Sequence, residues 1–181
     1  MSDAGNPTWT VDKRKLPNGS ISPKSRFKQR AFPFSSGFWI TREAYLKAGP
    51  FAETLSTNSD TEYCLRMYDA GLTGFYSDTP GVIIHEHQGT STGELANVTT
   101  RSKSADRANA FKTMSQKHAH YLAVHLDAAD FIYVRWLKHA LRANDSSSIQ
   151  AAISTAPNLF LKLKLRLLRA INGLVKKSSA S

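Results

Sequence analysis

Apolar residues recur at the spacing of an α-helix along much of the C-terminal part of the chain, and this regularity most narrows the folds that the chain can adopt. Between Asp106 and Leu126, and again in "DAADFIYVRWLKHALRAND" from Asp127, apolar side chains return every three or four residues. Such spacing places them on one face of a helix. Residues 127–181 are therefore predicted to form a helical tail.

The middle of the chain mixes strand and helix patterns. "AFPFSSGFWI" (31–40) is apolar and aromatic enough for a buried strand, and "TREAYLKAG" after it predicts a short helix with Thr41 as N-cap and Gly49 as its end. A second helix is predicted from about Thr61 to Ala70. Short strands are predicted at "GFYS" and "GVIIHEH". Strand followed by helix is therefore the local unit of this part of the chain.

The charge of the chain is strongly positive. Its 181 residues carry a formal net charge of +10 and a pI near 9.9, so the surface should attract anions such as nucleic acid, nucleotides or acidic lipid headgroups. One basic cluster, "DKRKLPNGSISPKSRFKQR" (12–30), is interrupted by proline and glycine. Residues 1–30 are therefore predicted to form a mobile basic arm.

The second basic cluster, residues 159–177, has the pattern of an amphipathic helix. Its basic face holds Lys162, Arg166, Arg169 and Lys176, and its opposite face holds Leu161, Leu163, Leu167, Leu168, Ile171 and Leu174. A helix lying in a membrane interface near anionic lipid has this pattern. A terminal helix packed on its own domain explains it equally well. A strand, suggested by "LKLKLRL" alone, is a third alternative.

Cysteine content and hydropathy favour an intracellular protein. Cys64 is the only cysteine, which excludes an intrachain disulfide framework and a cysteine zinc cluster. The N-terminus lacks the pattern of a secretory signal, and no stretch approaches about 18 consecutive apolar residues. We expect a cytoplasmic location.

The stretch "NSDTEYCLRMYDAG" (58–71) has a structural and a functional interpretation. In the structural one, Ser59 is an N-cap with Glu62 as its capping-box partner, and Glu62 pairs with Arg66 at i,i+4. Asp60 then simply favours the positive end of the helix dipole. In the functional one, Asp60 is a catalytic acid at a helix start.

The order of neighbouring motifs favours the functional interpretation. The first motifs are a Gly-aromatic strand and an Arg-Glu-Ala helix that ends in Gly-x-Phe, and "SDTEYCLR" follows them. After these come Ala-Gly with an aromatic strand, then "VIIHEHQGTS", and finally "NAFKTMSQKH". From Phe34 to Tyr121 this order resembles the acceptor-side half of family 2 glycosyltransferases of the GT-A fold. The residues that carry it are Gly37, Phe38, Arg42, Glu43, Ala44, Gly49, Phe51, Ala70, Gly71, Phe75, Tyr76, Phe111, Lys117 and His118.

The resemblance implies a fold and a reaction. The fold would be α/β: residues 31–126 would form the acceptor-side half of a GT-A-like domain, a partial GT-A mixed sheet with helices, followed by the helical C-terminal tail. The reaction would be inverting transfer of a sugar from a nucleotide sugar to a glycan or lipid-linked acceptor, with Asp60 as general base. Glu62 would be a second acid or would orient the site. Arg66 and Trp39 would bind the acceptor, although core packing explains Trp39 at least as well.

The resemblance also implies a metal. A histidine at the end of the apolar strand would hold Mn²⁺ or Mg²⁺ on the departing diphosphate, and His85 and His87 point to the same strand face, so either could serve. A surface strand edge is the alternative explanation of this pair.

Three departures from the family pattern limit what the chain is expected to do. Ser59 stands where the family has Glu, Pro50 stands where it often has Gly, and nothing before Phe34 supplies the Asp-x-Asp motif of the donor half. We therefore expect an incomplete catalytic domain that is completed by a missing N-terminal half or by another chain. Its other expected partners are the nucleotide-sugar donor, the glycan or lipid-linked acceptor, and the inner face of a membrane. The alternative is a basic, non-catalytic module that binds nucleic acid or acts as a scaffold. It would bind phosphates through Lys13 to Arg30 and stack bases on Phe32, Phe34, Phe38 or Trp39. Nucleic acid is the less favoured partner.

Overall fold

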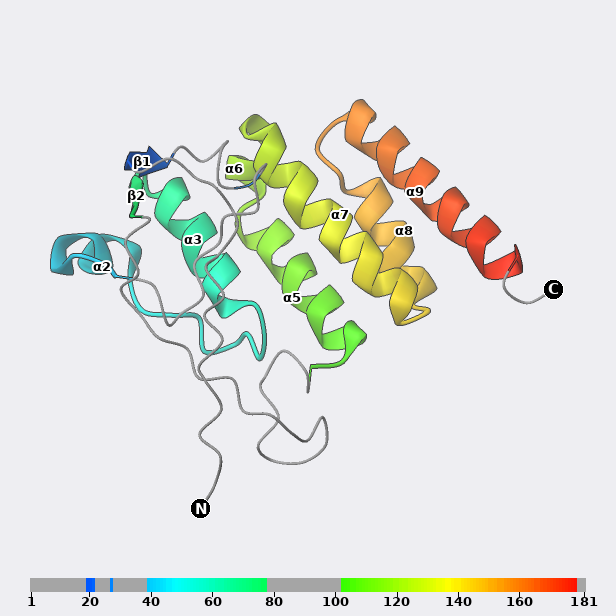
Figure 1. Ribbon diagram of the computed structural model, residues 1–181, viewed down its shortest axis with the longest axis horizontal. Helices are drawn as coiled ribbons and strands as arrows, with labels where there is room; N and C mark the ends of the chain where they lie inside the picture. Colours follow the sequence, from blue (N-terminus) through cyan, green and yellow to red (C-terminus); the bar gives the residue numbers. More distant parts are fainter. Residues whose placement is uncertain (1–18, 22–26, 28–38, 78–101, 179–181) are drawn as a thin grey trace, which may run out of the picture.

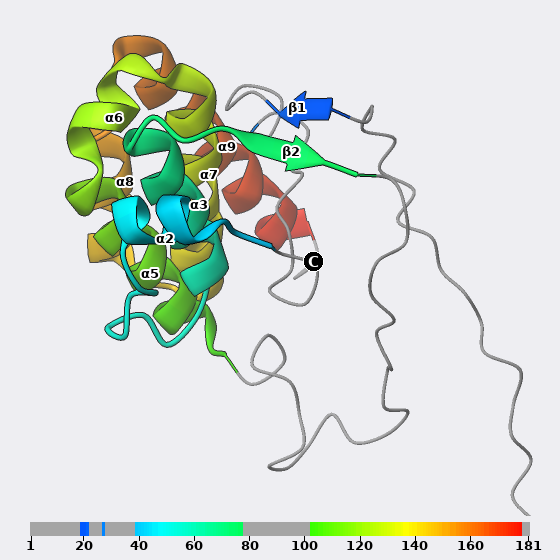
Figure 2. The ribbon, with the colours of Figure 1, turned by 90° about the vertical axis from the view of Figure 1, so that its left-hand side faces the viewer.

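Helices packed side by side make up most of the part of the protein that the structure describes, and a small antiparallel sheet lies at one side of them (Figures 1 and 2). The computed structural model describes residues 19–21, 27, 39–77 and 102–178. Its elements are β1 (Gly19–Ile21), α2 (Arg42–Ala48), α3 (Ser59–Asp69), β2 (Gly74–Tyr76), α5 (Ser104–Lys117), α6 (Ala119–Val124), α7 (Leu126–Arg142), α8 (Ser146–Ser154) and α9 (Leu159–Ser178).

Helix α2 has the two ends predicted from its sequence. The Thr41 hydroxyl accepts a hydrogen bond from the backbone N–H of Ala44 at 3.2 Å. At the other end, the N–H of Gly49 donates to Tyr45 O, and Gly49 has φ +77, a conformation that glycine adopts without strain. Both cap predictions are confirmed.

Helix α3 starts differently from the prediction. Its N-cap is Asn58, with φ 57, whose carbonyl accepts the first helical hydrogen bond from Glu62 N at 3.1 Å. Ser59 is already inside the helix, so the capping box predicted for Ser59 and Glu62 is wrong. The physical reason is that the Glu62 carboxylate is bound by cationic side chains instead. Gly71, with φ 71, follows the end of α3 as predicted.

The two strands join distant parts of the chain. β1 pairs antiparallel with β2, with Gly19 opposite Tyr76 and Ile21 opposite Gly74. The strand at "GFYS" is confirmed. The basic arm predicted for residues 1–30 is wrong for residues 19–21, which pair in this sheet, and for Phe27, which is buried.

Phe27 contacts two aromatic residues of the helical core. Its ring lies 6.0 Å from that of Tyr68 on α3 and 5.8 Å from that of Phe131 on α7, measured between centroids. Phe27 is 2% exposed, and removing its large apolar ring from water stabilises the fold. The other predicted strands, 31–38 and 81–87, lie outside the described residues, and Trp39 and Ile40 are not in a strand.

One hydrophobic core runs through the described helices. It extends from Phe27 to Leu165 and includes Leu65, Phe111, Ile132 and Trp136, all nearly inaccessible to solvent. The core therefore crosses the boundary predicted at residues 126 and 127, and the helical tail is not a separate unit. Helix α7 packs against α5, α6, α8 and α9, and Figure 1 shows it in the centre of this group.

Helix α9 is helical over the predicted range and packs on the domain. Leu161 and Leu165 are buried, and Lys164 forms an ion pair with Asp130 on α7. The alternative of a strand at "LKLKLRL" is wrong. Among the described helices, none is both long enough and apolar enough to pass through a bilayer.

Candidate functional site

Glu62, in the first turn of α3, is the buried charge around which the candidate site is built. Its side chain is only 1% exposed. Taking a carboxylate out of water costs several kcal/mol unless cations and hydrogen bonds replace the lost hydration. The side chains around Glu62 should therefore be positively charged.

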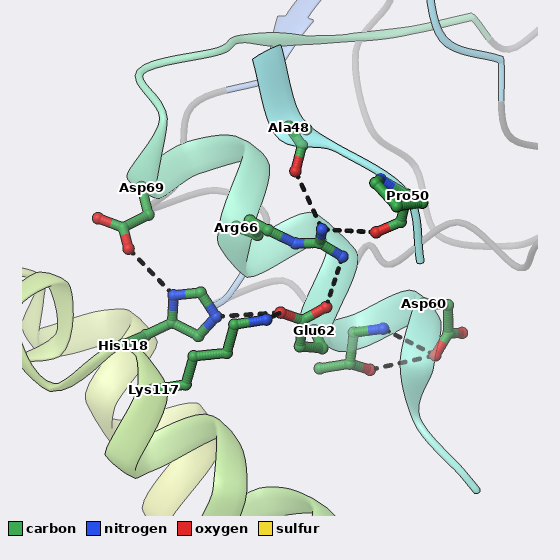
Figure 3. Close-up of polar contacts among 9 residues, drawn as sticks. Ala48, Pro50, Asp60, Glu62, Arg66, Asp69, Lys117 and His118 are labelled. Carbon is green, nitrogen blue, oxygen red and sulfur yellow. Dashed lines mark hydrogen bonds and ion pairs between the residues drawn. The ribbon is translucent and has the colours of Figure 1, made fainter. Parts of the chain in front are cut away.

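Three side chains provide those contacts (Figure 3). Arg66 Nη2 donates to Oε2 of Glu62 at 2.9 Å, which confirms the predicted i,i+4 pair. From the end of α5, Lys117 Nζ donates to Oε1 at 2.7 Å, and His118 Nε2 lies 3.3 Å from the same oxygen. Both carboxylate oxygens of Glu62 are thus engaged, and the contacts join α3 to α5.

These contacts set the ionisation of Glu62. Burial alone raises its pKa, but hydrogen bonds from His118 and Lys117 and the charges of Arg66 and Lys117 outweigh burial, so the pKa falls from 4.5 to about 2. Glu62 is therefore ionised near neutral pH. It acts as a fixed negative charge that orients its neighbours, and it holds no proton to donate there.

His118 lies between two carboxylates. Its Nδ1 is 3.0 Å from Oδ2 of Asp69, at the end of α3, and its Nε2 faces Glu62. A carboxylate accepts hydrogen bonds and does not donate them, so both contacts are satisfied together only when both ring nitrogens carry protons. His118 is 3% exposed, so it is a buried side chain that bridges Glu62 and Asp69 along one side of α3.

Arg66 ties the end of α2 to α3. Its Nη1 donates to the carbonyl oxygens of Ala48 at 3.0 Å and Pro50 at 2.6 Å, in addition to the Glu62 contact. Within the described part of the chain, the buried Nε has no hydrogen-bond partner. The acceptor-binding role of Arg66 stays a prediction, and its terminal nitrogens are used by protein groups.

Asp60 lies apart from this cluster. Its Oδ1 accepts a hydrogen bond from Thr61 N at 2.7 Å and lies 3.5 Å from the Thr61 hydroxyl. Figure 3 shows its side chain on the other side of the first turn of α3 from the His118 and Asp69 contacts. The carboxylate is half-buried, and no hydrogen bond among the described residues uses Oδ2. Thr61 thus holds one oxygen of Asp60, and within the described part of the chain the other oxygen has no hydrogen-bond partner.

Of the remaining predicted site residues, only Trp39 is among those that the structure describes. Trp39 is 84% exposed, which rules out core packing for it. His85 and His87 lie outside the described residues. Nowhere in ranges 39–77 and 102–178 do three His, Cys, Asp or Glu side chains group so as to hold a metal ion. The described residues thus do not provide the predicted Mn²⁺ or Mg²⁺ site.

Sequence reasoning missed the roles of Asp69, Lys117 and His118 around Glu62. In the sequence, Lys117 and His118 stand out only as part of a motif, and no pattern marks Asp69. The available signal was a Lys-His pair at the end of a predicted helix, which indicates charge there but not its partner.

No protein-family model, curated protein or solved structure matches this chain. Functional inference therefore depends on the geometry around α3 and on the motif order in the sequence.

Proposed function

We propose that this chain is the acceptor-side half of an inverting glycosyltransferase of the family 2, GT-A type, and that Asp60 is its general base. The observation that carries the proposal is the state of two neighbouring acids on α3. Glu62 is buried and fully engaged, whereas Asp60, two residues earlier, is half-buried and has one oxygen without a partner among the described residues.

In the proposed reaction, Asp60 removes the proton of an acceptor hydroxyl. The hydroxyl oxygen attacks the anomeric carbon of a nucleotide sugar, a new glycosidic bond forms, and the bond from that carbon to the diphosphate breaks. The proton remains on Asp60, and the electron pair leaves with the nucleoside diphosphate. The Thr61 N–H, 2.7 Å from Oδ1, would hold the carboxylate in place.

The Glu62 cluster supports this role by fixing the helix that carries Asp60. Contacts from Lys117 and His118 attach the first turn of α3 to α5, and Arg66 attaches α3 to the backbone after α2. A general base needs to be held near its proton by a rigid element, since misplacement by about 1 Å can cost roughly 100-fold in rate. Glu62 and Arg66 are therefore proposed as positioning residues.

Other parts of the proposal depend on groups beyond the described residues. A donor-binding half, supplied by another segment or chain, would bring the nucleotide sugar, and the acceptor would be a glycan or lipid-linked glycan. Mn²⁺ or Mg²⁺, with His85 or His87 among its ligands, would stabilise the departing diphosphate. The described side chains do not form a metal site, and the proton transfer to Asp60 requires none. We propose a cytoplasmic site of action.

The test is sugar transfer by the enzyme completed with its donor-binding half. Asp60→Asn should lower kcat by roughly 100-fold to 10,000-fold and leave KM for the acceptor nearly unchanged. Asp106→Asn, which changes a carboxylate in the first turn of α5, is the matched control and should retain full transfer. Full transfer by Asp60→Asn would refute the assignment of the base.

A thermal-shift titration of the enzyme completed with its donor-binding half tests the metal. Nucleotide sugars should raise the Tm only with Mn²⁺ present, and His85→Ala or His87→Ala should abolish that shift. The nucleic-acid-binding alternative predicts instead that Asp60→Asn has no effect and that binding of single-stranded nucleic acid falls steeply with salt.

A further inference from the structure

Helix α9 carries two apolar stripes, and only one of them is used in packing. Leu161 and Leu165 are buried against the other helices. Leu163, Leu167 and Leu174, on another side of the helix, are 53%, 61% and 68% exposed. Because residues three, four and seven apart lie on one helical face, these three leucines form a continuous outward stripe.

Further apolar side chains extend this outward stripe. Phe160 is 79% exposed and Ile171 is 47% exposed. Phe160 also borders a groove of about 660 Å³ between α7 and α9, whose lining includes Leu126, Phe131 and Val134. Leu126 is itself 58% exposed. The exposed apolar surface therefore reaches from α9 to the start of α7, and an uncovered surface of this kind indicates a binding partner.

The charges on α9 identify the partner. Residues 159–178 contain lysine and arginine but no aspartate or glutamate. Arg166 and Arg169 are exposed and Lys162 is partly exposed, and at 100° per residue they flank the leucine stripe on the side away from Lys164. On the opposite flank, Lys164 is paired with Asp130. The surface is thus aliphatic in its centre and cationic along one edge.

We propose that this face of α9, defined by Leu163, Leu167 and Leu174 with Arg166 and Arg169 at its edge, docks onto the surface of an anionic lipid bilayer. The leucines would enter the boundary between headgroups and acyl chains, and the long basic side chains would reach up to lipid phosphates. A second copy of the chain is a poorer fit, because pairing two such faces would bring two acid-free basic helices together.

The proposal agrees with the charge of the whole chain and does not depend on glycosyl transfer. A net charge of +10 favours approach to an anionic membrane, and each lysine or arginine near the surface adds attraction. The helix lies along the bilayer here, since none of the described helices has the character needed to span one. Packing through Leu161 and Leu165 holds α9 on the domain while the other stripe faces outward.

The test is co-sedimentation of the full chain with vesicles of phosphatidylcholine alone or of phosphatidylcholine mixed with phosphatidylglycerol. Wild-type protein should bind the anionic vesicles, and binding should weaken as salt rises. The double variant Leu163→Ser and Leu167→Ser should lower the partition coefficient by at least roughly 10-fold. Arg166→Gln with Arg169→Gln should lower it by roughly 30-fold.

Leu46→Ser is the matched control, because Leu46 on α2 is 69% exposed and lies outside the stripe; it should bind like wild type. Circular dichroism checks that each variant is folded. If the leucine variant does not fold, the arginine variant still tests the proposal. Equal binding to neutral and anionic vesicles would overturn the proposal. Vesicle binding by the leucine variant at the wild-type level would also overturn it and would assign membrane attachment to residues 12–30. A third contrary result is a wild-type chain that dimerises, does not bind vesicles, and becomes monomeric in the leucine variant.

Discussion

Lys117 Nζ lies 2.7 Å from Oε1 of Glu62, although 55 residues separate the two in the chain. The lysine side chain is 47% exposed, whereas the glutamate side chain is 1% exposed. The lysine therefore keeps part of its hydration, while the carboxylate depends on its protein partners. Removing Glu62 and removing its neighbour Asp60 should consequently have very different effects.

Glu62→Gln should lower the free energy of unfolding by about 2–4 kcal/mol, because it leaves cationic partners without a charge to face. Asp60→Asn should cost less than about 1 kcal/mol, since it only weakens a charge at the start of a helix. Urea unfolding of the two variants measures both values. Equal costs would contradict the division between a structural and a solvent-accessible acid on α3.

The stability that Glu62 provides should depend on pH. Its pKa is lower in the folded protein, about 2 against 4.5, so the unfolded chain takes up the proton first as pH falls. This contribution is fully present above about pH 4.5 and is lost as pH falls toward about 2. The difference in unfolding free energy between wild type and Glu62→Gln should shrink over that window. A constant difference would show that Glu62 titrates normally.

His139 should make the fold sensitive to mild acid. It is buried on α7, its ring is stacked 5.8 Å from that of Phe111, and its pKa is lowered from 6.5 to about 4 by burial and by Arg107 and other nearby cations. The unfolded chain therefore binds this proton at a higher pH, and stability should fall as pH drops from about 6.5 to about 4.

His139→Phe should flatten the dependence of Tm on pH in that window while keeping an aromatic ring against Phe111. His120→Gln, which changes an exposed histidine of α6, should leave the wild-type profile intact. Identical profiles for His139→Phe and wild type would mean that other groups cause the acid sensitivity.

The hydrogen bond between α7 and α8 should be worth more than a surface contact. Trp136 Nε1 donates to Ser148 Oγ at 2.6 Å, and both residues are buried. Ser148→Ala leaves the indole N–H without an acceptor and should cost about 1–3 kcal/mol. Ser146→Ala, at the exposed start of α8, is the control for loss of a hydroxyl. In a double-mutant cycle with Trp136→Phe, strictly additive costs would argue against a coupled pair.

Local features of the fold could be predicted from the sequence because neighbouring residues determine them. Thr41 caps α2 through a residue three positions away, Gly49 ends that helix by its own backbone freedom, and Arg66 reaches Glu62 one turn away. The exposed position of Trp39 could not be predicted in the same way, because an aromatic side chain suits both a core and a surface.

Contacts between distant residues were beyond sequence reasoning. The pairing of β1 with β2 joins strands far apart in the sequence, and the convergence of Lys117 and His118 on Glu62 depends on where the end of α5 lies relative to α3. The helix start shows how a distant contact changes a local one. Glu62 suited a capping box by its spacing from Ser59, but the cations Arg66 and Lys117 bind its carboxylate more strongly than one backbone N–H would.

The burial of Phe27 bears on how the protein can be shortened. Its ring contacts both Tyr68 and Phe131 and is only 2% exposed, so deleting it would open a cavity between α3 and α7 and cost about 3–5 kcal/mol. A fragment that begins at Trp39 would keep the helices α2 to α9 and still lose part of the core that holds them together. The segment predicted as a mobile basic arm thus supplies part of the core, and a shortened chain that keeps Phe27 should be more stable than one that begins at Trp39.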